Sequence, residues 1–133
     1  MVRVLIHMPT LSARGGAERY AAEIAAVLRD AGHSVALAAV GDLDLIDLGA
    51  YFGLDLRGVE LVRLPPADRI ERMRPRRRAQ QLRDALWSRR LRAWKPDVLV
   101  NTVYRSELHL AGVPLVVVCH FPHARPATAT GLA

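Results

Sequence analysis

The sequence predicts an α/β protein built on an open, mostly parallel sheet with helices on both of its faces. Three observations support this fold class. Short apolar runs of strand length recur along the chain, stretches of helix-forming residues separate them, and glycine or proline stands at most of the boundaries. The 133 residues, 51% of them hydrophobic and 24% charged, fit one folded domain with its own core.

The first forty residues predict a complete strand–helix–strand unit. Residues 2–7 form a short apolar run that is typical of a buried strand, and residues 8–16 are rich in turn residues. Strong helix formers with apolar spacings of three and four occupy residues 17–31, and Gly32 ends that helix. Residues 34–40 then form a second strand, which should lie parallel to the first.

The rest of the chain repeats the pattern less regularly. A helical turn or two is expected from Leu45, broken by Gly49 and Gly53. Residues 67–95 should be helical with an interruption at Pro75. Further strands are expected at residues 59–64, 97–101 and 113–119. The predicted domain therefore covers residues 1–124, and residues 125–133 form an irregular tail.

The basic charge is concentrated in residues 67–95. This segment holds eleven basic and three acidic side chains, so its net charge is +8, whereas the net charge of the whole chain is +6. The simplest interpretation is a packing helix whose arginine heads reach water, and contact with an anionic membrane surface is the alternative. Nucleic acid is not expected, because aromatic residues are few and no nucleic-acid motif is present. On a helical wheel the apolar side of this helix holds Ala79, Leu82, Leu86, Trp87, Leu91 and Trp94, with Arg83 and Arg90 projecting from the same side.

Composition also indicates the cellular compartment in which the protein is expected. The single cysteine, Cys119, excludes an internal disulfide and a cysteine-based zinc cluster, and it favours a reducing compartment. The amino-terminal apolar run is too short for a signal peptide or a spanning helix. We therefore expect a cytoplasmic protein, with peripheral contact to the inner membrane surface as the alternative.

Candidate binding residues follow the predicted strands, because an open parallel sheet binds its ligand beyond the carboxyl ends of the strands. Gly15 and Gly16 directly precede a helix, where free backbone N–H groups attract phosphate; a plain tight turn is the other interpretation. His120 follows the fifth strand, where it could donate a hydrogen bond or move a proton, or simply pack. His120 and His123 lack a neighbouring acid, so no metal is expected.

Two sequence segments resemble a known family. The opening, with Gly-Gly-Ala-Glu-Arg at residues 15–19 and Gly-His-Ser-Val at residues 32–35, is similar to the start of family 4 glycosyltransferases of the GT-B fold. Residues 95–100, Lys-Pro-Asp-Val-Leu-Val, and residues 116–122, Val-Val-Val-Cys-His-Phe-Pro, resemble later strands of the same family. The His-Phe-Pro form is similar to the mannosyltransferase branches.

The resemblance implies the amino-terminal, acceptor-side half of a GT-B enzyme with a Rossmann-like sheet. Such an enzyme transfers a sugar, with retention of configuration, from a nucleotide-sugar donor to an acceptor hydroxyl on a glycan, lipid or small molecule, without a cofactor or metal. By matching position Gly15 and Gly16 would border the donor diphosphate, and His120 would act in catalysis against the donor sugar. Acceptor or rim contacts would fall to Arg14, Glu18, Asn101 and Arg105.

The resemblance also implies a second Rossmann-like domain that binds the donor and has no counterpart in these residues. We therefore expect the 133-residue chain to be a fragment that is inactive by itself. Two alternatives stay open at this stage. The chain could be a non-catalytic subunit or membrane-surface adaptor acting through residues 67–95, or a nucleotide-binding α/β protein of another family.

Overall fold

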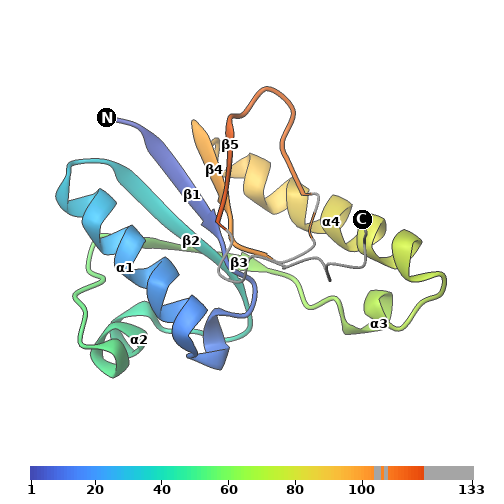
Figure 1. The fold of residues 1–133 in the computed structure, drawn as a ribbon, viewed down its shortest axis with the longest axis horizontal. Helices are drawn as coiled ribbons and strands as arrows, with labels where there is room; N and C mark the ends of the chain where they lie inside the picture. Colours follow the sequence, from blue (N-terminus) through green and yellow to red (C-terminus); the bar gives the residue numbers. More distant parts are fainter. Residues whose placement is uncertain (104–105, 107, 119–133) are drawn as a thin grey trace, which may run out of the picture.

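The computed structural model, which describes residues 1–103, 106 and 108–118, contains the predicted parallel sheet. Five strands, all parallel, lie side by side in the order β3-β2-β1-β4-β5 (Figure 1). The fold class is therefore confirmed as α/β and Rossmann-like. The strands are β1 (Arg3–His7), β2 (Ser34–Val40), β3 (Glu60–Leu64), β4 (Val98–Asn101) and β5 (Leu115–Val117).

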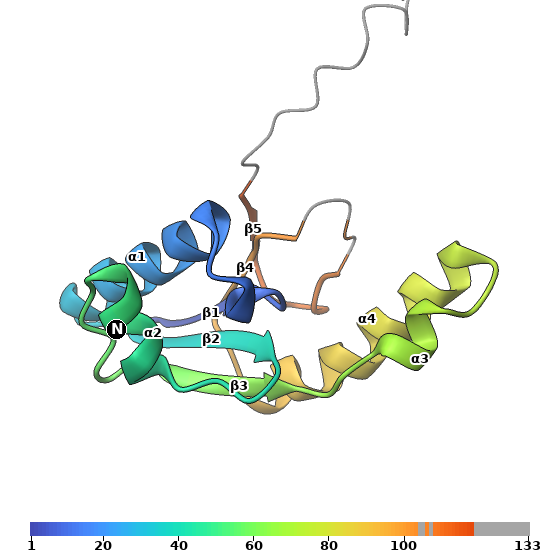
Figure 2. The same cartoon turned by 90° about the horizontal axis from the view of Figure 1, so that it is seen from below.

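Helices cover both faces of this sheet, as the sequence predicts. Helices α1 and α2 lie on one face and α4 lies on the other (Figure 2). Alternate side chains of the central strand enter the two layers, so that Ile6 packs with the α1 and α2 side and Leu5 with the α4 side. The helices are η1 (Leu11–Ala13), α1 (Gly16–Asp30), α2 (Leu45–Phe52), α3 (Asp68–Glu71) and α4 (Arg76–Ala93).

Helix α2 has the length expected for two turns, but the expected break at Gly49 is wrong, because the helix continues through Gly49 and ends at Gly53. A β-carbon on Gly49 would lie 2.6 Å from the carbonyl oxygen of Leu54, so the next segment of chain packs directly on the backbone of this helix. Gly53 has a φ of 70° and provides the left-handed residue that ends the helix. Gly49 is thus a close-packing position, and only Gly53 is a terminator.

The break at Pro75 is confirmed, and it separates α3 from α4. One residue of the predicted apolar side of α4 was placed wrongly. Leu82 is 48% exposed, whereas Trp87 and Leu91 are buried. Leu82 belongs to the first half of α4, and this half projects past the end of the sheet with α3 as its neighbour (Figure 2).

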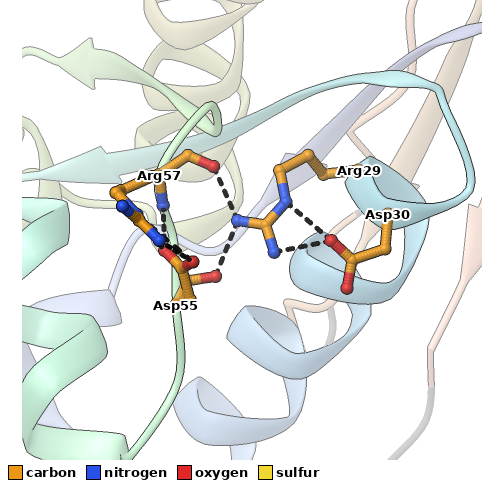
Figure 3. Close-up of polar contacts among 4 residues, drawn as sticks. All are labelled: Arg29, Asp30, Asp55 and Arg57. Carbon is orange, nitrogen blue, oxygen red and sulfur yellow. Dashed lines mark hydrogen bonds and ion pairs between the residues drawn. The ribbon is translucent and has the colours of Figure 1, made fainter.

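An arginine at the end of α1 anchors the segment that leads into β3 (Figure 3). Arg29 donates hydrogen bonds of 2.6 Å to the carbonyl oxygens of both Asp55 and Arg57, and its guanidinium also pairs with Asp30 at 2.8 Å. Hydrogen bonds from Arg57 hold the pKa of the Asp55 carboxyl below its usual range. These contacts satisfy carbonyl groups of an irregular segment that has no strand partner there.

The outer strand β5 differs from the other four. Leu115, Val116 and Val117 are 41%, 49% and 63% exposed, so its apolar side chains are exposed on both faces. Strands of parallel sheets are usually covered on both faces. Among the described residues, no helix is long and apolar enough to cross a bilayer.

Candidate functional site

The candidate site lies at the carboxyl ends of β1 and β4. These strands are neighbours, with His7 opposite Asn101, although most of the chain separates them. After β1 the chain moves to β2 on one side, and β4 lies on the other side, so the strand order reverses between them. Thr102 ties the two ends together, because its N–H and its hydroxyl both donate to the carbonyl oxygen of His7, at 3.2 and 2.7 Å. Ligands of open α/β sheets bind at such a reversal.

The loop after β1 brings the two predicted glycines to this edge. The short turn η1 ends at Arg14, whose φ of 58° is left-handed, and Gly15 then precedes the first turn of α1. The Glu18 side chain folds back on this loop. Its carboxylate accepts a hydrogen bond of 2.8 Å from the N–H of Gly15 and a longer one, 3.5 Å, from the hydroxyl of Thr10. Glu18 is only 8% exposed, so it holds the loop from inside.

The two glycines have different surroundings. A β-carbon on Gly15 would lie 2.8 Å from the Glu18 carboxylate, whereas one on Gly16 would meet no atom within 4 Å. The N–H of Gly15 is already paired with Glu18, so the orphan donors of the first helical turn begin at Gly16 and Ala17. The open backbone for a phosphate is therefore at Gly16, and Gly15 makes room for Glu18.

Arg14 is exposed, and its guanidinium lies over the ring of Tyr51, 4.9 Å from the ring centre. This contact joins the loop after β1 to α2. Sequence reasoning did not select Tyr51, because the two residues lie far apart along the chain and no spacing connects them. The stack holds a positive charge beside the beginning of α1.

Asn101 ends β4 and is almost fully buried. Its side-chain oxygen accepts a hydrogen bond from the N–H of Val103 at 3.0 Å, and its side-chain nitrogen donates to the carbonyl of Leu108 at 3.3 Å. Both ends of the amide are thus used to shape the turn after β4. This geometry suits a positioning residue better than a direct contact, and the predicted acceptor contact stays a prediction.

His7 occupies the carboxyl end of β1 and is fully buried on the α4 side of the sheet. Its ring packs edge-on against Trp87, with 5.5 Å between ring centres. Neither ring nitrogen has a hydrogen-bond partner among the described residues. Burial, together with a smaller effect of the positive charge on Arg83, lowers the pKa of His7 from 6.5 to about 4. His7 is therefore neutral at pH 7.

A polar groove of about 460 Å³ lies between α4 and the residues that follow the β4 turn. Both walls carry groups that form hydrogen bonds, so the groove suits a polar or hydroxyl-bearing molecule. Its lining residues are Arg77, Gln80, Gln81, Asp84, Ala85, Ser88, Leu108 and His109.

Two predicted residues, Arg105 and His120, lie outside the described residues. Within the part of the chain that the structure describes, no three His, Cys, Asp or Glu side chains gather into a possible metal site. The structure thus brings together Arg14, Gly15, Gly16, Glu18 and Asn101 at one edge of the sheet.

A parallel sheet in this strand order, with a glycine-bearing loop and a helix amino terminus at the reversal, defines a Rossmann-like domain that binds its ligand at the carboxyl edge. The model of the family described as Glycosyltransferase Family 4 matches residues 14–131. The chain therefore belongs to glycosyltransferase family 4, and its fold is consistent with the amino-terminal half of a GT-B enzyme. This excludes the alternative of an unrelated nucleotide-binding protein.

Comparison with curated proteins found no match, and neither did comparison with solved structures.

Proposed function

We propose that this chain is the acceptor-side part of a retaining glycosyltransferase. The reaction breaks the bond between the anomeric carbon of a sugar and the diphosphate of a nucleotide donor. It forms a bond from that carbon to an acceptor oxygen, with the same anomeric configuration, while the nucleoside diphosphate leaves and takes up the hydroxyl proton. The observation that carries the proposal is the position of the α1 amino terminus at the strand-order reversal, in a chain of family 4.

The donor diphosphate is assigned to the amino terminus of α1. The orphan N–H groups at Gly16 and Ala17 point out of the first turn, and the 15-residue helix places its positive dipole end there. Glu18 adds a negative charge close by, but its carboxylate is turned to Gly15 and Thr10. Arg14, held over Tyr51, offsets that charge on the exposed side of the loop.

Donor binding requires more than this edge of the sheet. A diphosphate sugar also needs groups that hold its nucleotide, and we assign these to a second Rossmann-like domain. The exposed apolar side chains of β5 support further polypeptide packed beside the sheet, because parallel strands are normally covered. We therefore expect the 133-residue chain to transfer no sugar by itself.

The finer assignments are also proposals. His120 is assigned to the donor sugar, where a hydrogen bond would orient it or stabilise positive charge as the bond to the diphosphate breaks. Arg14 and Arg105 are assigned to the acceptor side of the crevice, and Glu18 and Asn101 position the two loops. The sugar is assigned to the mannose class on the His-Phe-Pro segment alone.

Titration of ¹⁵N-labelled chain with a nucleoside diphosphate mannose tests the proposed function. We expect weak binding, with a dissociation constant of about 1 mM or higher, because only one side of the donor site is present. The amide signals of Gly16 and Ala17 should shift most, and no sugar should reach an added acceptor. NAD serves as the control ligand. Robust transfer by the pure chain would contradict the two-domain proposal, and a clear preference for NAD would contradict the donor assignment.

The variant Gly16→Ala separates ligand contact from folding. A methyl group at Gly16 meets no protein atom within 4 Å, and alanine favours the helix, so stability should rise by about 0.5–1 kcal/mol or stay unchanged. If a phosphate approaches this backbone, the same methyl group should weaken donor binding about tenfold in the complete enzyme, seen as a raised KM.

The matched control is Gly15→Ala, whose methyl group displaces the Glu18 carboxylate. It should cost about 1 kcal/mol of stability through the lost hydrogen bond to Glu18. An unchanged KM for the donor in Gly16→Ala would remove Gly16 from the donor site.

A further inference from the structure

The end of the α3–α4 hairpin projects away from the body of the protein. Helix α3, the link that follows it and the first turn of α4 extend beyond the carboxyl end of β3 (Figure 2). Residues 69–78, which we name the hairpin tip, are all exposed except Ile70, which is partly buried. The hairpin tip therefore offers an exposed, projecting surface at the same edge of the sheet as the candidate site.

The hairpin tip carries most of the net charge of the chain. It holds six arginines and one acid, Glu71, so that this ten-residue segment contributes +5 of the total +6. Glu71 reaches Arg83, outside the tip, at 3.5 Å. Among the described residues, none of the six arginines forms an ion pair with a carboxylate. The arginines are Arg69, Arg72, Arg74, Arg76, Arg77 and Arg78.

Three of these arginines stand where a helix least favours positive charge. Arg76, Arg77 and Arg78 form the first turn of α4, which has no acidic residue and no side-chain cap. The positive end of the helix dipole destabilises this arrangement. Helix stability therefore does not account for these arginines, whereas an anionic partner would relieve the unfavourable charge.

The apolar residues of the hairpin indicate which class of polyanion it contacts. Met73 stands in the link between α3 and α4, between Arg72 and Arg74, and is 47% exposed, and Leu82 is exposed on α4. Arginines around an exposed flexible apolar side chain match a bilayer surface, which offers phosphate groups above an apolar layer. The tip has no aromatic side chain on which bases could stack, which disfavours nucleic acid.

We propose that the hairpin tip binds the surface of an anionic phospholipid bilayer. Clusters of four to eight basic residues are sufficient for such binding. Because the tip projects beyond the carboxyl edge of the sheet, binding would hold that edge toward the membrane. The surface acts whether or not the chain transfers sugar, so its test is independent of the proposed function.

Vesicle co-sedimentation with the 133-residue chain tests this proposal. The vesicles contain phosphatidylcholine with about 30 mol% phosphatidylserine, at about 0.15 M salt, and pure phosphatidylcholine vesicles are the reference. We expect binding to the anionic vesicles only. The triple variant R76A/R77A/R78A should lower the partition coefficient at least about tenfold, and R76K/R77K/R78K, which keeps the charge, should stay within about threefold of the original chain.

The matched control is R89A/R90A/R92A, which removes the same charge from exposed positions near the other end of α4. It should change the partition coefficient less than about threefold, since these residues lie away from the tip. Melting temperatures of all variants check that each one folds. Failure to bind anionic vesicles, or an equal loss in the two alanine variants, would overturn the proposal. Tighter binding to a single-stranded oligonucleotide than to vesicles, with the same arginine dependence, would reassign the tip to nucleic acid.

Discussion

Replacing Trp87 with alanine should lower the free energy of unfolding by about 3–5 kcal/mol, the cost of truncating a large buried aromatic side chain. Trp87 is 4% exposed and lies between α4 and the sheet, where it packs against Leu5 and Leu91 in one core cluster. Its indole N–H also donates a hydrogen bond of 2.8 Å to the carbonyl of Pro65, which anchors α4 to the segment after β3. The measurement is urea unfolding followed by circular dichroism.

The variant Trp87→Phe separates the two contributions of this side chain. It keeps an aromatic ring against His7 but leaves the Pro65 carbonyl without its donor, so we expect a loss of about 1–2 kcal/mol. The control is Leu82→Ala, at an exposed position of the same helix. This substitution should change the free energy of unfolding by no more than about 0.5 kcal/mol. A loss below about 1 kcal/mol in Trp87→Ala would contradict the packing of α4 on the sheet.

Acid should destabilise the protein through His7 by about 3 kcal/mol between pH 6.5 and pH 4. The pKa of His7 falls from 6.5 in the unfolded chain to about 4 in the folded one, and each unit corresponds to about 1.4 kcal/mol. The unfolded chain therefore binds more protons in this window. The contribution of His7 to stability is fully present above pH 6.5, decreases as the pH falls, and levels off below about 4.

The variant His7→Leu isolates this effect from the titration of carboxylates. Leucine fits an apolar site of similar size and leaves no unpaired nitrogen, so stability at pH 7 should change by less than about 1.5 kcal/mol. The charged group on α4 that acts on His7 is Arg83, which pairs with Asp84 at 3.4 Å, and both side chains stay in place. From pH 7 to pH 4 the original protein should lose about 3 kcal/mol of stability relative to His7→Leu. Parallel pH curves would show that the His7 ring finds a proton acceptor or water.

Local sequence patterns were sufficient for most of the fold. The run at residues 34–40 predicted β2 to the residue, and the helix formers before Gly32 predicted α1 within one residue at either end. Strand period, helix period and turn chemistry are properties of neighbouring residues, so they can be read without knowing the packing. The break at Pro75 has the same local cause.

Features that depend on distant residues were missed. Gly49 resembled a helix terminator, but the carbonyl of Leu54 packs against it and explains why a glycine stands within α2. Leu82 fell on the apolar side of a helical wheel, yet it is exposed in the half of α4 that projects past the sheet. A wheel describes one helix, and whether its apolar side is covered depends on where the strands stop.

In the candidate site, too, some features follow from local sequence pattern and others depend on distant residues. The sequence by itself predicted that Gly15 and Gly16 stand before a helix and that Asn101 ends a strand, because both follow from local pattern. Only the tertiary structure placed β1 beside β4, separated the roles of Gly15 and Gly16, and buried His7 against Trp87. Those outcomes depend on strand order and on side chains that meet across long stretches of chain, and long-range packing leaves no short-range trace in the sequence.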